Sequence, residues 1–197
     1  MTSPDKQPGA PDPSSEPTYA DRVYRSSMGI AGGVILLAVG LWMGGDAVLR
    51  GEGRTPWVAA ALLVLAVPLV VAFTFRPAVY ANADRLRIRN PFRTIELPWG
   101  TVATVRATYS TEAVTQDGTK YQLWAVPVSL RERKKAVRAG GAEPGGAQRT
   151  LGELRDLAEG GEHRPSAQGE PRVRWAYEIL APVGAGLAAL AVLLVTG

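Results

Sequence analysis

The sequence contains no cysteine and only one histidine among its 197 residues. Without cysteine, disulfide bonds, thiolate metal ligands and a cysteine nucleophile are excluded. A single imidazole cannot form a two-histidine metal site. His163 also lies in a stretch rich in glycine and proline, whereas a Ser-His-Asp triad needs its histidine on a rigid element. We therefore expect neither a metal site nor a catalytic histidine.

The motifs that accompany common enzyme chemistries are also missing. There is no P-loop, no GxGxxG after a predicted strand and no metal-ligand spacing. The glycine-rich stretch that begins at Gly51 has no strand before it and no lysine within it. We expect that the protein is not an enzyme and that it uses no cofactor.

Long apolar segments are what the sequence has instead. Residues 28–49, 57–75 and 175–195 each approach the roughly 20 residues that cross a hydrocarbon core about 30 Å thick. Their only charged residues, Asp46 and Glu178, fall near segment ends, where water and headgroups solvate them, so an intramembrane proton relay is the less favoured interpretation. The sequence predicts three transmembrane helices, because so small a chain has too little soluble surface to bury three such segments.

The segment before the first span, residues 1–27, is rich in proline, serine and acidic residues, a composition typical of a disordered tail. It is unlike the short basic start of a cleavable signal peptide, so we predict a signal anchor. Arginines flank the spans mainly on the tail side and on the side of the long stretch between the second and third spans, although the hairpin carries Arg50 and Arg54. The positive-inside rule therefore predicts a multi-pass cell-membrane protein, with the tail and long stretch cytoplasmic and the C-terminus extracytoplasmic.

The first span carries two GxxxG pairs, Gly29 with Gly33 and Gly40 with Gly44, on roughly one helical face. Small residues at this spacing let helix backbones approach closely within lipid. Chance explains the pairs about equally well, because the segment is rich in glycine. As an interpretation, the pairs predict a packing surface for the second span or for a second copy.

The stretch 76–138 has the period-two pattern of short strands. Within 85–89, apolar side chains alternate with arginines, which predicts a half-buried strand with a basic outer face. Turn signals at Asn90–Phe92 and at Asp117-Gly118 separate the runs. We predict five or six strands in a small antiparallel barrel or sandwich, with a core formed by Leu86, Ile88, Ile95, Leu97, Trp99, Val102 and Val105.

Residues 139–174 predict a flexible linker with one short helix. Three leucines recur at helical spacing over 150–159, and Thr150 with Glu153 forms a capping-box pattern at its start. Packing on the strand domain is favoured over packing on the membrane or on a partner, because most amphipathic stripes face a core.

The segment 76–107, together with YQLWAVPV at 121–128, resembles the bacterial PH-like domain of the low-molecular-weight protein antigen 6 type. That family occurs mostly in small actinobacterial membrane proteins. The resemblance rests on the arginine-flanked RNP turn and on the PW..V..V segment that starts at Pro98. It implies a PH-like split barrel and brings no catalytic residues. The glycine usual after the first turn aspartate is absent, because Arg85 follows Asp84.

An excess of basic side chains over residues 76–138 indicates an anionic partner. Beside a membrane, basic residues more often face lipid headgroups than nucleic acid, so we expect no nucleic-acid partner. The leading hypothesis is a membrane-anchored interaction module that presents a basic surface to anionic lipid or to a protein partner. The candidate contact residues are Arg85, Arg87, Arg89, Arg93, Lys134 and Lys135.

Two other interpretations remain open. The protein could be a scaffold or homo-oligomer that assembles through its glycine pairs and uses the PH-like domain only to bind protein. The arginines could also do no more than keep an exposed strand face solvated, as charged residues commonly do on strands.

Overall fold

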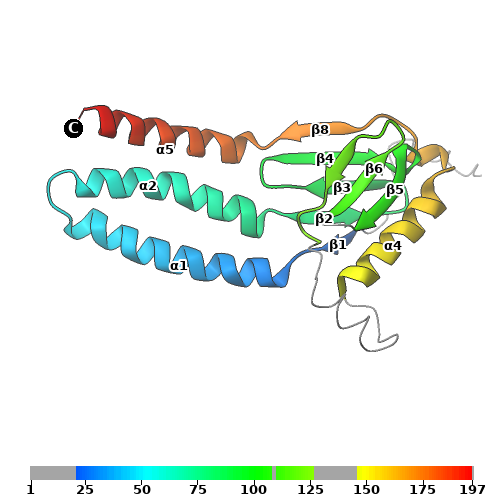
Figure 1. The fold of residues 1–197 in the computed structure, drawn as a ribbon, viewed down its shortest axis with the longest axis horizontal. Helices are drawn as coiled ribbons and strands as arrows, with labels where there is room; N and C mark the ends of the chain where they lie inside the picture. The colour runs from blue at the N-terminus through cyan, green and yellow to red at the C-terminus, as the bar shows by residue number, and fades with distance from the viewer. Residues whose placement is uncertain (1–20, 108–109, 127–145, 197) are drawn as a thin grey trace, which may run out of the picture.

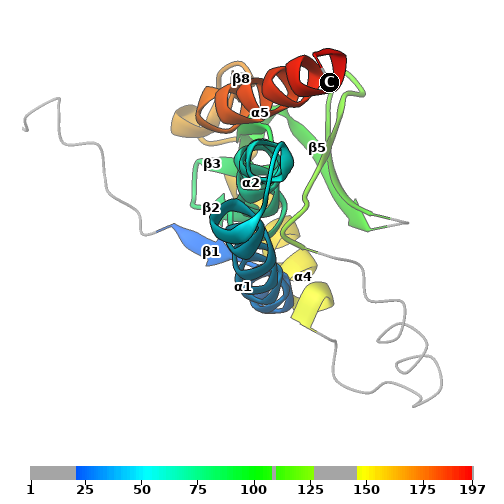
Figure 2. The same cartoon turned by 90° about the vertical axis from the view of Figure 1, so that its left-hand side faces the viewer.

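The computed structural model describes residues 21–107, 110–126 and 146–196. Three long helices lie side by side, with the second in the middle (Figures 1 and 2). They are α1 (Ser27–Arg50), α2 (Thr55–Val70, continued by the π-helix η1, Val71–Phe75) and α5 (Tyr177–Val195). Each is long and apolar enough to cross a membrane, and their bounds lie within two residues of those predicted.

The side chains on the outside of these helices are mainly apolar. Trp42, Leu49 and Leu194 are among the large side chains left exposed. Such a surface needs an apolar environment, so the helices indicate a membrane location. At one end, the Arg54 guanidinium of the α1–α2 hairpin donates to the carbonyl of Leu193 near the end of α5. The β-sheet domain lies at the other end (Figure 1).

The glycines of α1 differ in what surrounds them. A Cβ at Gly33 would lie 2.2 Å from Thr74 Oγ1, so η1 packs directly on Gly33, and a Cβ at Gly44 would lie 2.6 Å from a Leu63 methyl carbon, so α2 packs directly on Gly44. No atom comes within 4 Å of a Cβ built at Gly40, which faces open space. The two predicted pairs therefore do not act as one surface: Gly33 contacts η1, Gly44 contacts α2 and Gly40 contacts neither.

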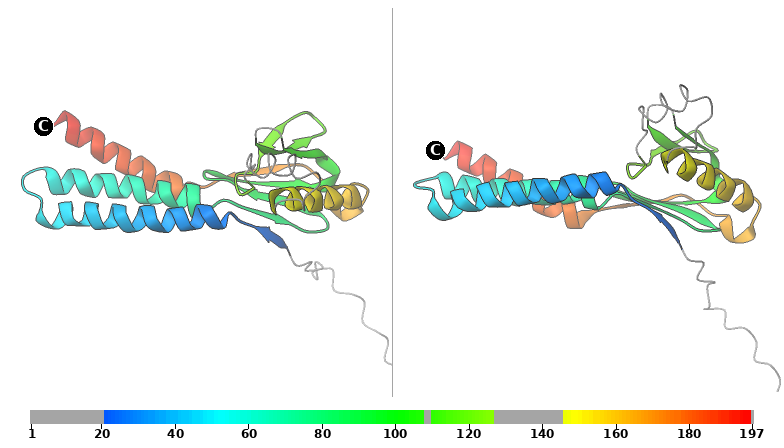
Figure 3. Two further views of the ribbon diagram at one scale, coloured as in Figure 1. Left: turned by 60° about the horizontal axis from the view of Figure 1, so that its bottom comes forward. Right: turned by 90° about the horizontal axis from the view of Figure 1, so that it is seen from below.

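The β-sheet domain contains two separate antiparallel sheets that do not close into one barrel (Figure 3). The larger sheet has the order β1-β2-β3-β4-β8, and the smaller has the order β5-β6-β7. The 3-10 turn η2 (Trp99–Thr101) joins them. The strands of the larger sheet are β1 (Arg22–Tyr24), β2 (Ala78–Ala81), β3 (Arg85–Arg89), β4 (Arg93–Pro98) and β8 (Arg172–Trp175). Those of the smaller are β5 (Val102–Ala107), β6 (Thr111–Thr115) and β7 (Lys120–Gln122).

The core lies between the two sheets and helix α4 (Gly146–Gly161). All seven side chains that the sequence places in the core are at most 5% exposed. Leu154 of α4 is fully buried among them, so this helix packs on the domain. It is longer than the predicted 150–159 at both ends.

Both edges of the larger sheet come from segments that are predicted to be tail and linker rather than strands. Arg22–Tyr24 falls in the predicted tail 1–27, and Arg172–Trp175 falls at the end of the predicted linker 139–174. They pair with β2 and β4, because each supplies backbone partners to an edge that would otherwise be open. As a result, β1 leads into α1, β2 follows α2 and η1, and β8 leads into α5 (Figure 1).

A basic groove beside the first turn of α5

The larger sheet has one face turned away from β5–β7 and α4, and we call it the outer face (Figure 3). Strand register places residues of the outer face in rows across the sheet. The row nearest the helices contains Arg89, Thr94 and Arg174, and the next row contains Tyr80, Arg87, Glu96 and Arg172. Arginines from β3 and β8 therefore stand on the same face, two strands apart.

A groove with a volume of about 790 Å³ runs along this face to the start of α5. Four arginines and two glutamates line it, together with aromatic side chains and Thr94. The arginines are Arg76, Arg87, Arg89 and Arg174. Tyr80, Trp175 and Tyr177 are the aromatic residues of its wall.

The charges in the groove are only partly balanced. Arg87 lies 2.9 Å from a Glu96 carboxylate oxygen, and Arg76 lies 2.6 Å from one of Glu178. The Arg174 guanidinium has no side-chain partner among the residues that the structure describes, although it lies in the same row as Arg89. The positive potential is therefore concentrated at the end of the groove that lies nearest the helices.

The pKa of the Tyr80 phenol reflects the nearby positive charge. Burial raises the pKa of its phenol, but hydrogen bonds from Arg25 and Arg89 outweigh that effect and leave the pKa below its ordinary value. The Arg25 guanidinium donates to the phenol oxygen over 3.0 Å. A lowered phenol pKa means that negative charge is stabilised at this position.

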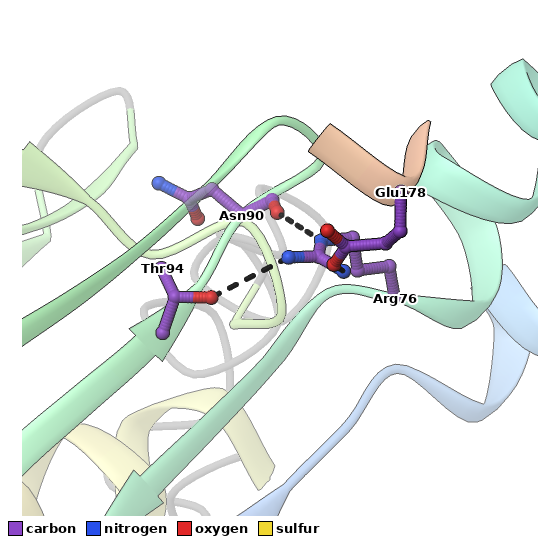
Figure 4. A network of polar contacts seen from close by, with 4 residues as sticks. All are labelled: Arg76, Asn90, Thr94 and Glu178. Atoms are coloured by element: carbon purple, nitrogen blue, oxygen red, sulfur yellow. Dashed lines mark hydrogen bonds and ion pairs between the residues drawn. The ribbon is translucent and has the colours of Figure 1, made fainter. Parts of the chain in front are cut away.

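Arg76 forms the floor of the groove where the domain meets the helices (Figure 4). Its Nε donates to the Asn90 carbonyl over 3.2 Å, and one terminal nitrogen lies 3.5 Å from Thr94 Oγ1. The other donates to Glu178 of α5 over 2.6 Å. The Arg76 side chain is only 8% exposed. One guanidinium thus links the end of α2 to the β3–β4 turn, to β4 and to α5.

Aromatic side chains gather at the level where the helices meet the domain. The rings of Phe92 and Trp124 each contact Phe73 of η1 edge-on, with centroids 5.4 and 5.5 Å away. Trp124, Trp175 and Tyr177 are all more than 40% exposed. Exposed aromatics at the end of apolar helices are typical of proteins whose helices end at the headgroup layer of a membrane.

The six predicted contact residues separate in the structure. Arg87 and Arg89 line the groove, but β3 runs along the direction of the helices, so Arg85 lies about 13 Å farther from them than Arg89 (Figure 1). Arg85 lines a smaller cavity of about 270 Å³ with Arg172. Arg93 has the parity of buried Ile95 and does not line the groove. Lys134 and Lys135 lie outside the described residues.

Sequence reasoning missed Arg76 and Arg174 as site residues and used them only to assign topology. One signal was present, because RVRW at 172–175 alternates basic and apolar residues like the predicted strand at 85–89. Strands β3 and β8 both pair with β4, and no local sequence pattern indicates this pairing.

Comparison with known proteins bears on the domain alone. Searches of the curated proteins and of the solved structures give no match to the chain. The family model of the bacterial PH domain matches residues 76–156, which begin at Arg76, include β2 to β7 and end within α4. The chain therefore combines three apolar helices of membrane-spanning length with a β-sheet domain that matches the bacterial PH domain.

Proposed function

We propose that this protein is a membrane-anchored, non-enzymatic interaction module whose groove binds the phosphate-bearing headgroup of an anionic lipid. The observation that carries the proposal is the set of three arginines, Arg76, Arg89 and Arg174, around Thr94 beside the first turn of α5. Guanidinium groups bind phosphate through paired hydrogen bonds, and a threonine hydroxyl supplies a further donor.

The spacing suits such a ligand. Neighbouring strands lie about 4.8 Å apart, so the backbones of Arg89 and Arg174 are roughly 10 Å apart with Thr94 between them. Two long side chains at this separation can converge on one phosphate. Glu96 offsets the charge of Arg87 in the next row, which leaves the row of Arg89 and Arg174 as the more attractive position.

The position of the groove favours a lipid over a soluble anion. Trp175 and Tyr177 flank it at the start of an apolar helix, so a headgroup reaches it without leaving the bilayer surface. Anionic leaflets attract each nearby arginine by about 1 kcal/mol. This arrangement also refines the prediction from sequence: the end of the arginine strand, rather than its whole length, faces the headgroups.

The test uses the full chain, because residues 77–160 alone would lack β1, β8 and Arg174. The protein in neutral detergent micelles is titrated with a fluorescent, short-chain phosphatidylglycerol. We expect the Arg89→Gln/Arg174→Gln variant to bind about 30-fold more weakly, since two hydrogen-bonding contacts to the phosphate of about 1 kcal/mol each are lost. The matched control is Arg106→Gln/Arg164→Gln, which removes the same charge away from the groove and should bind like the parent.

Two further arms identify the source of the phosphate. Glycerol phosphate should compete only weakly if the acyl chains contribute, whereas equal competition would identify a soluble phosphate ligand. If both double variants lose affinity equally, the attraction is general and the groove is not a site. Binding of an acidic peptide in preference to the lipid would instead support the protein-binding alternative.

The side of the membrane that carries the domain is part of the proposal. Strand β1 and the domain lie at one end of the helices, and the hairpin and the last turn of α5 lie at the other (Figure 1). The distribution of arginines supports a cytoplasmic domain. We therefore expect alkaline phosphatase fused after Gly197 to be active and a fluorescent protein fused there to be dark. The opposite pair of results would reverse the topology.

The antigen 6 type and the actinobacterial origin rest on the resemblance alone and remain predictions.

A further inference from the structure

Arg76 belongs both to the groove and to the junction between α2 and α5. Its guanidinium faces the groove beside Thr94, and the same group holds the Glu178 carboxylate. Glu178 also lines the groove, and its side chain is 61% exposed there. The carboxylate is thus an anion bound at the edge of the site by one of the site's own arginines (Figure 4).

We propose that Glu178 is a built-in competitor for the ligand: it takes up on Arg76 the position that a phosphate in the groove would occupy. This inference rests on the proposed function. Arg76 is nearly buried, and an unpaired buried charge is strongly unfavourable, so Arg76 keeps an anionic partner throughout. Ligand binding therefore exchanges one anion for another, and Glu178 is released into solvent.

The exchange acts on α5, because Glu178 lies in its first turn. Ala176 and Ile179 are buried against Ala72 of η1, so the apolar half of the junction persists when the charged half opens. Strand β8 continues directly into the same turn and carries Arg174 into the groove. A ligand that binds Arg174 and displaces Glu178 therefore moves one continuous segment, which consists of the end of β8 and the first turn of α5. Groove occupancy and the position of α5 against α2 are coupled.

The binding test compares Glu178→Gln with the parent chain, using the same fluorescent phosphatidylglycerol. Glutamine keeps the shape of the side chain and can still accept a hydrogen bond from Arg76, but it does not compete as an anion. We expect binding about three- to tenfold tighter than in the parent. Glu170→Gln, an exposed position outside the groove, removes the same charge and should not change affinity. Glu178→Asp, which keeps the charge, should stay close to the parent.

A distance measurement reports the movement of α5. Since the chain has no cysteine, spin labels can be placed specifically at Ala66→Cys on α2 and Ala181→Cys on α5, both exposed positions. We expect the lipid to shift the label distance in the parent, and Glu178→Gln without lipid to show the shifted distance already.

The outcomes separate the two proposals. If the parent binds the lipid and Glu178→Gln binds equally or more weakly, the competitor is wrong while the groove stands. If the parent does not bind but Glu178→Gln does, the competitor is supported and the parent is held closed. If neither binds, both proposals fail. An unchanged label distance despite binding would overturn the coupling to α5.

Discussion

Replacing Trp99 with alanine should lower the free energy of unfolding of the domain by about 3–5 kcal/mol. Trp99 is the largest fully buried side chain, and it lies in the turn that joins the two sheets. Its indole nitrogen donates to the Asn82 carbonyl over 2.8 Å. A Cβ at Gly161 of α4 would lie 2.6 Å from the ring, so the helix packs directly on it. Alanine at position 99 would leave a cavity between the two sheets and α4.

The measurement is denaturant unfolding of the full chain in detergent, followed by near-ultraviolet circular dichroism. Trp99→Phe is the control, because it keeps most of the buried volume and loses the hydrogen bond to Asn82. We expect a loss of about 1–2 kcal/mol for phenylalanine. A Trp99→Ala midpoint equal to that of the parent would contradict the central place of this side chain in the core.

Gly33→Ile should separate α1 from α2 and lower helix-bundle stability by about 3 kcal/mol, the upper part of the range for overpacking. A Cβ there would lie 2.2 Å from Thr74 Oγ1 and 2.8 Å from the Phe75 ring. Both residues belong to η1, next to Arg76, so they cannot move without disturbing the junction with the domain.

Gly40→Ile is the matched control, because the same side chain enters open space at that position. Resistance to sodium dodecyl sulfate in mixed micelles, read from the helical circular dichroism signal, compares the two variants with the parent. Equal stability of both variants would show that the close approach at Gly33 does not contribute to packing. Equal loss in both would show that the entire glycine face is used, as the spacing alone suggests.

Much of the fold follows from local pattern. Long uncharged runs identify the three helices, and strict alternation identifies β3 and the buried side chains of β4, because burial on one face imposes a period of two. Strands β1 and β8 escape this reasoning. They are only three and four residues long, and six of their seven residues are exposed, so neither run shows a buried face and the brief alternation at 172–175 does not identify the strand that it pairs with.

The groove is less predictable than the fold for a related reason. Arg89 is recognisable as part of a basic strand face, but its nearness to Arg174 depends on the pairing of β4 with β8, far apart in the chain. The glycines of α1 show the same limit. Spacing predicts which residues share a helical face, whereas Gly33 and Gly40 differ because η1 lies directly opposite Gly33 and nothing in the described part of the chain lies opposite Gly40.

The positions of the two edge strands in the chain also determine when the larger sheet can be completed during translation. Strand β1 is made before the first apolar helix, and β8 is made only just before the last one. Until Trp175 has left the ribosome, β4 has an unpaired edge and the groove lacks one wall. The domain thus reaches its final form only after β8 has been translated, and nascent chains that stop before β8 should expose a strand edge that chaperones and proteases recognise.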